Sequence, residues 1–390
     1  GRLNVSITEP IGGHGGLEFY DLGLCEALSS QNIDVSLYTC DKTKLHLEYE
    51  HSYSVLTPYK KVFGPTNRIF RGIRYIRGTL SAVFDSLRRR STIAHFHIFS
   101  FSLLEYLNIL IFKIFRFRIV ATIHDVESLA GIEGSKSKKK YYKFSNIIDH
   151  IVVHNSFTKA EVIKRNPFYD PEKIHVIPPT DLDFLFNEDI SRSDAREALG
   201  FELPEDSRII LFFGQIKKTK GLDILIKAFA QLKEKNVFLV IAGRCWKTDM
   251  DKYHSLINSL KIKNKTIIEE KYIKNRDVMR LFKAADVVVL PYIKVYNSSV
   301  LLRGMDYGAV NVVSDLSFFT EVIKDGSNGL IFKSGDIKEL RSVLSVILND
   351  KKLLKRIGEN SKKFVQQNYS FDVIGEQVRS VYDRLEKAKL

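Results

Sequence analysis

Residues 210–232, ILFFGQIKKTKGLDILIKAFAQL, carry the pattern from which the architecture of this chain can be predicted. The segment starts with an apolar run, turns at a glycine, passes lysines beside a second glycine and continues with apolar residues at helical spacing. Such a strand, turn and helix form the repeating unit of a parallel α/β sheet. The unpaired N–H groups and the positive dipole end at the start of such a helix suit a phosphate group.

The same arrangement occurs twice more further along the chain. The strand pattern VFLVIAG (237–243) ends at a glycine followed by Arg244, and ADVVVLPY (285–292) leads to the polar segment YNSSVLLRGMDYG (296–308), which begins another helix pattern. Lysine and arginine side chains beside these turns add charge-assisted hydrogen bonds to an anion. The C-terminal half is therefore predicted to be a doubly wound α/β domain that holds a polyphosphate.

The N-terminal half also alternates strand and helix patterns. RLNVSITEP (2–10) predicts a strand, GGHGG (12–16) a turn, and residues 17–31 a helix. Short segments rich in β-branched residues predict further strands: DVSLYTC (34–40), IAHFHIF (93–99), RIVATIHDV (118–126) and IIDHIVVHN (147–155). Parallel strands joined by helices indicate a second right-handed doubly wound sheet.

The length of 390 residues indicates more than one domain, because a single hydrophobic core stops growing beyond about 250–300 residues. We predict an N-terminal domain over residues 1–180, an interdomain linker over 181–205, a C-terminal domain over 206–370 and a last helix over 371–390.

The composition bounds the class of protein and its location. Three cysteines without metal-ligand spacing favour a reducing compartment over a disulfide framework. We find no leader pattern and no uninterrupted run of about 18 apolar residues that would suggest a spanning helix, so we expect a cytoplasmic location. The net charge of +14 fits an anionic membrane surface or anionic substrates. Nucleic acid is not expected as a partner, because zinc-finger spacing and RNP-type aromatic motifs are missing.

Residues 68–90 predict a basic amphipathic helix. Projected at helical spacing, its apolar residues fall on one narrow face: Ile69, Ile73, Ile76, Leu80, Val83 and Leu87. Its arginines lie beside or opposite that face: Arg71, Arg74, Arg77, Arg88 and Arg89. Such a helix can lie on anionic lipid, or it can pack its apolar face on its own domain. Residues 101–117 are apolar nearly all round and predict a buried helix that covers the sheet.

With these segments placed, the chain resembles the glycosyltransferases of the GT-B fold, and within them the group 1, or family 4, enzymes that use nucleotide sugars. The resemblance covers nearly the whole chain and is strongest over residues 209–332. It implies two Rossmann-like domains that face a cleft. The nucleotide sugar is then expected mainly on the C-terminal domain and the acceptor on the N-terminal domain, with the last helix returning to the N-terminal domain.

The resemblance also assigns site residues. FFGQIKKTKGLDILIKAF (212–229) matches the segment that binds the donor diphosphate, IAGR (241–244) a glycine-ending strand, and residues 296–303 the donor loop. The implied donor-binding residues are Gly15, Gly16, Gly214, Lys217, Lys220, Gly243, Arg244, Tyr296, Asn297, Ser298, Ser299, Val300 and Arg303. In the N-terminal glycine loop, Gly13 and His14 are expected near the acceptor, since only glycine lets a backbone approach a ligand so closely.

His124, in ATIHDVESL (121–129), matches the family histidine that lies near the transferred sugar. The resemblance implies retention of the anomeric configuration. No acidic pair in the sequence suggests a magnesium site, so no metal is predicted. If the enzyme instead inverts the configuration, a general base is required, and Asp125 and Glu127 are the candidates.

The chain departs from the family at one known motif. The paired glutamates, separated by seven residues, would fall at Val295 and Arg303, and neither residue is acidic. PYIKVYNSSVLLRG (291–304) fits a subgroup without the pair, with Ser299 where glycine is commoner. This departure leaves the donor sugar open.

We therefore expect a glycosyltransferase that uses a nucleotide sugar and a lipid-linked or cell-surface glycan acceptor, peripheral on the inner face of a membrane. A catalytically silent subunit that binds a partner protein, or a nucleotide-sugar epimerase, remain alternatives. His95, His97 and His154 are expected to be structural.

Overall fold

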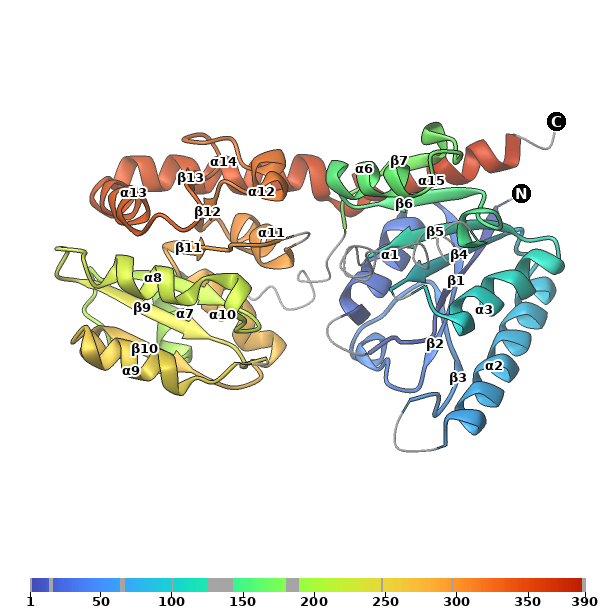
Figure 1. Ribbon diagram of the computed structural model, residues 1–390, viewed down its shortest axis with the longest axis horizontal. Coiled ribbons are helices and arrows are strands. Elements are labelled where there is room, and N and C mark those ends of the chain that lie inside the picture. Colours follow the sequence, from blue (N-terminus) through green and yellow to red (C-terminus); the bar gives the residue numbers. More distant parts are fainter. Residues whose placement is uncertain are drawn as a thin grey trace. The chain divides into compact units, whose positions relative to one another are not determined.

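The computed structural model describes residues 2–13, 17–63, 67–99, 101–124, 143–179, 189–246, 248–295 and 298–387. The chain divides into two compact units (Figure 1). The N-terminal unit comprises Gly1–Leu182 and Tyr369–Leu390, and the C-terminal unit comprises Asp183–Asn368. Each unit is an α/β domain around one parallel sheet, so the predicted architecture of two Rossmann-like doubly wound domains is confirmed.

The N-terminal unit contains a seven-stranded sheet in the order β3-β2-β1-β4-β5-β6-β7. Its strands are β1 (Leu3–Glu9), β2 (Ile33–Cys40), β3 (Ser54–Tyr59), β4 (Ile93–Ile98), β5 (Arg118–Ile123), β6 (His150–Val153) and β7 (Ile174–Val176). Its helices are α1 (Leu17–Ser30), α2 (Arg68–Arg88), α3 (Leu103–Ile114), α6 (Ser156–Arg165) and α15 (Phe371–Lys387), with short 3-10 turns at Leu45–Glu48 and Pro171–Lys173.

The C-terminal unit contains a six-stranded parallel sheet in the order β10-β9-β8-β11-β12-β13. Its strands are β8 (Arg208–Phe213), β9 (Val237–Ala242), β10 (Thr266–Glu269), β11 (Val287–Leu290), β12 (Val310–Ser314) and β13 (Leu330–Phe332). Its helices are α7 (Arg192–Ala198), α8 (Leu222–Phe229), α9 (Asp251–Ser259), α10 (Asn275–Ala284), α11 (Ser299–Asp306), α12 (Ser317–Val322), α13 (Ile337–Asn349) and α14 (Lys351–Tyr369), with 3-10 turns at Lys218–Lys220 and Lys263–Lys265.

Both sheets are buried on two faces, which explains their apolar sequences. Every residue of β4 and of β11 is buried. Parallel strands covered by helices on both faces read as continuous hydrophobic runs rather than as alternating patterns. In the C-terminal unit, two separate hydrophobic clusters form the two faces of the sheet.

In both sheets the strand order reverses beside the first strand. Strand β1 has β2 on one side and β4 on the other, and β8 has β9 on one side and β11 on the other. In open α/β sheets a ligand binds at the carboxyl ends of the strands next to such a switch point. The fold therefore predicts one candidate site in each unit.

The C-terminal helix α15 packs on α1 of the N-terminal unit. A Cβ atom added to Gly375 would lie 2.1 Å from the carbonyl oxygen of Ala27, so glycine permits this close approach. The hydroxyl of Tyr382, which is fully buried, lies 2.6 Å from Nδ1 of His95 on β4. The last helix is thus part of the core of this unit.

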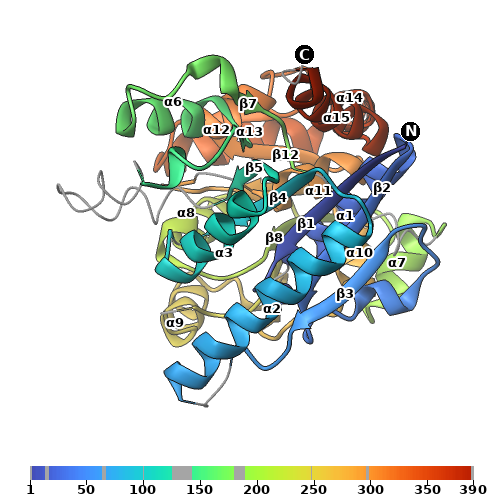
Figure 2. The ribbon, with the colours of Figure 1, turned by 90° about the vertical axis from the view of Figure 1, so that its right-hand side faces the viewer.

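Helix α2 lies beside α3 on the surface of the N-terminal unit, as both ribbon views show (Figures 1 and 2). Its buried residues are Tyr75, Gly78, Thr79, Ala82, Val83 and Ser86. Small residues let the helix lie close to β3, since a Cβ at Gly78 would come within 2.8 Å of the Tyr59 ring.

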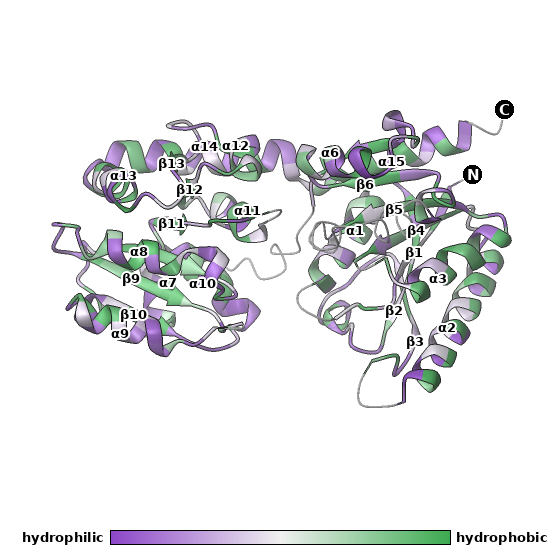
Figure 3. Ribbon diagram, viewed as in Figure 1, coloured by the Kyte–Doolittle hydropathy of each residue, from purple (hydrophilic) through white to green (hydrophobic). Residues whose placement is uncertain are grey.

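Most of the predicted apolar face of α2 is consequently turned outward. Ile69, Ile73, Leu80 and Leu87 are exposed by 70%, 50%, 36% and 42%, whereas Val83 is buried. Figure 3 shows hydrophobic and hydrophilic residues in close succession along α2 and α3. Of the two alternatives left open for this helix, packing of the whole apolar face on its own domain is wrong.

The predicted buried helix at residues 101–117 is α3, and it is buried on one side only. Asn108, Ile109 and Phe112 are buried, while Leu103 and Ile114 are exposed by 71% and 67%. The prediction therefore holds for the face that packs on the sheet. Within the residues that the structure describes, no helix has the length and apolar character needed to cross a membrane.

Candidate functional site

In the C-terminal unit, two glycines lie against each other at the carboxyl ends of β8 and β9. The N–H of Gly214 donates to the carbonyl of Ala242 at 2.9 Å, and a Cβ at Gly243 would lie 1.9 Å from the carbonyl oxygen of Gly214. Both have positive φ angles, 104° for Gly214 and 148° for Gly243, which side chains rarely tolerate. These two predicted residues thus pack backbone against backbone at the switch point, with Gly243 buried and Gly214 half-buried.

The side chain of Lys220 reaches Gly214. Its Nζ lies 3.2 Å from the position of a Cβ on Gly214, and it sits 5.0 Å from the centre of the Tyr292 ring at the end of β11. Val300 also contacts the same point, at 3.5 Å. The structure therefore brings together four of the predicted donor-binding residues: Gly214, Gly243, Lys220 and Val300.

The start of helix α11 belongs to the same region through Val300. Ser298 occupies the N-cap position, where a side chain usually accepts a hydrogen bond from the helix. Here its hydroxyl makes no such bond, and Oγ is buried without a hydrogen-bond partner among the described residues. Ser299 and Arg303 lie on α11 itself, Ser299 exposed and Arg303 half-buried.

The contacts described for Lys217 and Arg244 involve their main chains. The carbonyl of Lys217 accepts from Lys220, and the carbonyl of Arg244 accepts from Ile216. The side chain of Arg244 is exposed and that of Lys217 is half-buried. Their predicted role in binding the donor remains a prediction.

Several predicted site residues lie outside the described residues: His14, Gly15, Gly16, Asp125, Glu127, Tyr296 and Asn297. Gly13, predicted to face the acceptor, is described. Its φ is 73°, and a Cβ there would lie 2.4 Å from the main chain of Lys42. The packing of two loops therefore already requires glycine at this position.

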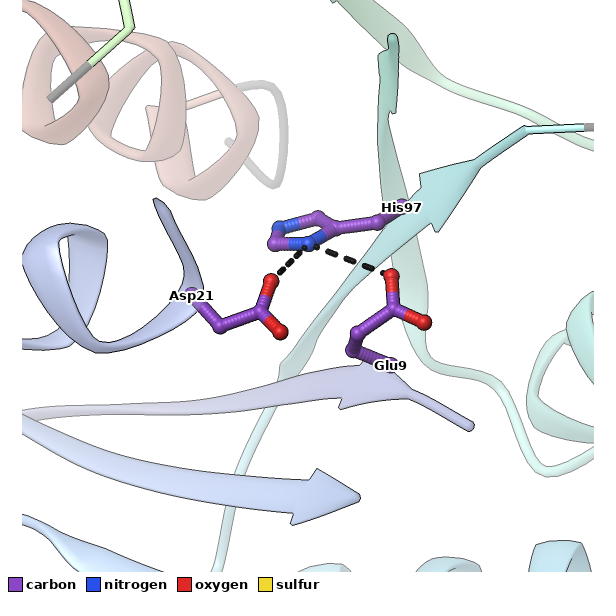
Figure 4. Close-up of side chains that lie close together, drawn as sticks. All are labelled: Glu9, Asp21 and His97. Carbon is purple, nitrogen blue, oxygen red and sulfur yellow. Dashed lines mark hydrogen bonds and ion pairs between the residues drawn. The ribbon is translucent and has the colours of Figure 1, made fainter. Parts of the chain in front are cut away.

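In the N-terminal unit, three charged side chains meet at the switch point between β1 and β4 (Figure 4). Glu9 ends β1, Asp21 comes from α1 and His97 lies near the end of β4. Nδ1 of His97 lies 2.8 Å from Oδ1 of Asp21 and 3.5 Å from Oε2 of Glu9. All three side chains are almost completely buried, with at most 1% of each exposed.

Burial and hydrogen bonding act in opposite directions on this cluster. Burial alone would lower the pKa of His97, but its hydrogen bonds to Asp21 and Glu9 raise that pKa to about 9. Burial raises the pKa of Glu9 to about 7, partly offset by its hydrogen bond to His97. Burial also raises the pKa of Asp21, partly offset by its hydrogen bond to His97, so His97 is the group of the three that is protonated most firmly near neutral pH.

The cluster retains unused hydrogen-bonding capacity. Beyond the contacts to Nδ1 of His97, Oδ2 of Asp21, Oε2 of Glu9 and Nε2 of His97 have no hydrogen-bond partner among the described residues. The three ligand atoms lie within 4.8 Å of one another, a spacing that could hold a metal ion. A metal bound through Nδ1 would have to displace the proton that His97 holds there.

His124, predicted to lie near the transferred sugar, stands at the end of β5 beside this cluster. Its ring stacks on Phe99 with centroids 4.7 Å apart, and Nδ1 lies 3.2 Å from Nε2 of His154. Its centroid is 5.0 Å from that of His97. Burial, together with His154 and His97, holds the pKa of His124 well below its usual range, so the ring is neutral and its buried Nε2 is unpartnered among the described residues.

Glu9 and Asp21 are not among the site residues predicted from the sequence, and His97 was expected to be structural. A signal was present, because a glutamate at the end of the first strand and an HFH triplet in a buried strand place polar groups where apolar ones are expected. Asp21 is adjacent to them only in space.

Comparisons with known proteins agree with this architecture. The family model "Glycosyl transferases group 1" matches residues 195–364, and "Glycosyltransferase Family 4" matches residues 14–180. An uncharacterized glycosyltransferase of Methanocaldococcus jannaschii is 31% identical over 189 residues, which is 48% of this chain and 47% of that protein. A D-inositol 3-phosphate glycosyltransferase of Xylanimonas cellulosilytica is 25% identical over 244 residues, 61% of this chain and 58% of that protein.

The aligned region thus spans about half the length of these relatives. Among solved structures, Anabaena HepE in complex with UDP and glucose superposes with a TM-score of 0.73 and 18% sequence identity, covering 98% of this chain and 100% of that one. At that identity the likeness establishes the fold alone.

Proposed function

We propose that this chain, which belongs to the group 1 glycosyltransferases of the GT-B fold, transfers a sugar from a nucleotide sugar to the hydroxyl group of an acceptor. One observation carries the proposal: Lys220 holds its ammonium group beside Gly214, which follows β8 and lies next to Val300 at the start of α11. A cation, a glycine turn and a helix start together suit a diphosphate.

The chemistry requires such a site. As the bond from the anomeric carbon to the donor phosphate breaks, the nucleoside diphosphate leaves with the electron pair and the sugar becomes cationic. Fixed positive charge at the diphosphate stabilises this transition state. Lys220 and the main chain at the start of α11 would supply it. In the retaining course that the family resemblance implies, the acceptor oxygen bonds to the anomeric carbon and its proton passes to the leaving phosphate.

The nucleotides bound in two structural neighbours support the same proposal by analogy. HepE was solved with UDP, and the catalytic domain of Arabidopsis thaliana starch synthase IV with ADP. A nucleoside diphosphate is therefore the first ligand to offer this chain. Metal independence and retention are part of the proposal, to be checked by assaying transfer with EDTA and by assigning the anomer of the product by NMR.

We further propose that the protein associates with an anionic membrane through α2 and α3. Phe70 and Phe84 on α2 are exposed by 61% and 59%, and the Phe84 ring contacts Phe115 just beyond α3. Together with the exposed Ile69 and Ile73, they give an apolar surface flanked by arginines. An apolar helix face bordered by basic residues is the usual form of an interfacial membrane anchor.

The test of the proposed function is binding of UDP, GDP and ADP, followed by assays with the matching nucleotide sugars. One nucleotide should raise the melting temperature of the wild type. Lys220→Ala should weaken that binding by about tenfold or more, because a charge-assisted bond to phosphate is lost. Lys218→Ala, in the same turn but with an exposed side chain, is the matched control.

The alternatives predict other results. A catalytically silent subunit would show no sugar transfer that Lys220→Ala reduces. An epimerase would release free nucleotide from the donor without any acceptor. If none of the nucleotides or nucleotide sugars binds, the proposal fails.

A further inference from the structure

The residues that directly follow β4, β5, β6 and β7 form a row along the carboxyl edge of the N-terminal sheet. They are Phe99, His124, His154 and Ile177. The strands that precede them pair with one another in this order and in parallel. Each member of the row therefore lies beside the next, although long connections separate them in the sequence.

The row ends on a main-chain group whose hydrogen bonds are fixed. The N–H of Ile177 donates to the carbonyl of Val153 at 2.8 Å, and the carbonyl oxygen of Ile177 lies 2.9 Å from Nδ1 of His154. A carbonyl oxygen only accepts, so Nδ1 of His154 carries a hydrogen. His154 is buried, and burial lowers its pKa to about 4, so the ring is neutral near neutral pH and its Nε2 is a lone pair.

The hydrogen bonds of His154 determine those of His124. Nε2 of His154 lies 3.2 Å from Nδ1 of His124. Because Nε2 of His154 is an acceptor, Nδ1 of His124 must carry the hydrogen of this bond. The ring of His124 is also neutral, since burial holds its pKa well below the usual range, so its Nε2 has a lone pair and no hydrogen. The carbonyl of Ile177 thus sets the tautomer of His124 through His154.

Aromatic contacts fix the plane of the His124 ring. Phe99 stacks on it with centroids 4.7 Å apart, and Tyr20 of α1 meets it edge-on at 4.4 Å. The side chain is half-buried, and Nε2 is buried without a hydrogen-bond partner among the described residues. A buried lone pair is costly unless a ligand supplies a donor. In this tautomer Nε2 can accept from a hydroxyl group but cannot donate to one.

We propose that His154 is a positioning residue for glycosyl transfer, which holds His124 in the Nδ1–H tautomer so that Nε2 accepts a hydrogen bond from a hydroxyl group of the transferred sugar. His154 acts through His124 and not on the substrate. The inference rests on the proposed function and on the predicted place of His124 near the sugar. It gives His154 a role beyond the structural one expected from the sequence.

The tautomer can be measured by NMR without a substrate. In protein labelled with isotopic nitrogen at its histidines, long-range proton–nitrogen spectra distinguish protonated from unprotonated ring nitrogens, and His124→Asn identifies the signals of His124. Wild-type His124 should show a protonated Nδ1 and an unprotonated Nε2. His154→Phe keeps a ring but removes both nitrogens, so it should shift His124 toward the Nε2–H form. His154→Gln, whose amide oxygen can replace Nε2 as the acceptor, should keep the wild-type form.

The second measurement is sugar transfer from the nucleotide sugar identified in the nucleotide screen. His154→Phe should lower kcat by about tenfold or more, because a hydrogen bond to the sugar is lost, and His154→Gln should stay within about threefold of the wild type. Neither variant should change the affinity for the free nucleoside diphosphate by more than about threefold, because the proposed diphosphate site belongs to the C-terminal unit.

A second histidine pair in the same unit provides the matched control. Nδ1 of His150 on β6 lies 2.7 Å from Nε2 of His175 on β7. His175→Phe breaks this pair and should leave both the tautomer of His124 and kcat unchanged. A merely structural His154 would affect the free energy of unfolding, measured in urea, without changing the tautomer.

The inference is overturned if wild-type His124 carries its hydrogen on Nε2, or if His154→Phe changes neither the tautomer nor kcat. It is also overturned if His154→Gln keeps the tautomer yet loses as much activity as His154→Phe. The wild-type spectrum and the glutamine variant decide the matter even where His154→Phe does not fold. Absence of transfer by a wild type with the Nδ1–H form refutes the proposed function, whereas transfer by a wild type with the Nε2–H form refutes this inference alone.

Discussion

The buried cluster of Glu9, Asp21 and His97 predicts a fall in the stability of the N-terminal unit between pH 6.5 and pH 9. The folded protein raises the pKa of His97 from 6.5 to about 9, so it holds the proton more tightly than the unfolded chain does. The stabilisation is complete below pH 6.5 and is lost as the pH rises toward 9. At about 1.4 kcal/mol per pH unit, the loss amounts to about 3 kcal/mol.

Other buried groups define this window. The raised pKa of Glu9 removes stability as the pH rises from 4.5 to about 7, in the same direction as His97. Burial lowers the pKa values of His95, His124 and His154. These three histidines therefore reduce the free energy of unfolding of the unit as the pH falls below 6.5. Between pH 7 and 9, His97 is accordingly the main contributor, among these five groups, to the change of stability with pH.

The assay is urea denaturation at a series of pH values, followed by pulsed hydrogen exchange at one fixed pH and mass spectrometry of peptides from β1 and β4. Asp21→Asn removes the hydrogen bond that raises the pKa of His97 most and should reduce the fall to less than about half. Asp85→Asn removes a carboxylate paired with surface arginines and should leave the fall unchanged, since its lowered pKa acts only in acid. A wild-type profile that is flat from pH 6.5 to 9, or a fall that persists in Asp21→Asn, would refute the reasoning.

Three further outcomes follow from packing and exposure. Gly375→Ala should destabilise the N-terminal unit by about 1–3 kcal/mol in urea denaturation, because the added methyl would meet a carbonyl oxygen of α1 at 2.1 Å. Gly72→Ala, in open space on α2, should instead stabilise it by about 0.5–1 kcal/mol, and equal effects of the two would contradict this account. Ile73→Ser should reduce co-sedimentation with phosphatidylserine vesicles, whereas Val346→Ser, at a similarly exposed position of the C-terminal unit, should not. Asp286→Ala should cost about 3–5 kcal/mol, measured by fluorescence of the single tryptophan in the C-terminal unit, because it leaves three arginines without their buried partner; a loss under about 1 kcal/mol would contradict that role.

The sheets, and the proximity of Gly214, Gly243 and Lys220 in the proposed nucleotide site, were predictable for one physical reason. In a parallel sheet the residues that directly follow adjacent strands meet at one edge, so Gly214 and Gly243 come together although 29 positions separate them. Lys220 ends a short 3-10 turn that follows β8, the strand that Gly214 also follows, and it therefore reaches the same edge of the sheet. The order of strands and turns in the sequence is enough to place these three residues at one edge of the sheet.

The polar cluster of the N-terminal unit and the orientation of α2 were not predictable in this way. Asp21 and His97 lie 76 positions apart and meet because α1 packs over the sheet. The helix α2 buries mainly small residues together with Tyr75 and Val83, and Gly78 lets it approach Tyr59 of β3 closely. A projection of hydrophobicity identifies the apolar face of such a helix but not the side that packs.

The proposed nucleotide site and the proposed membrane surface depend on different physical terms, which makes them separable in one experiment. Lys220 is half-buried and lies 5.0 Å from the centre of the Tyr292 ring. Arg68 is exposed on α2, where salt screens charges over about 8–10 Å at ordinary ionic strength. Raising the salt concentration should consequently weaken binding to phosphatidylserine vesicles more than binding of the nucleotide, because buried charges are screened less than exposed ones.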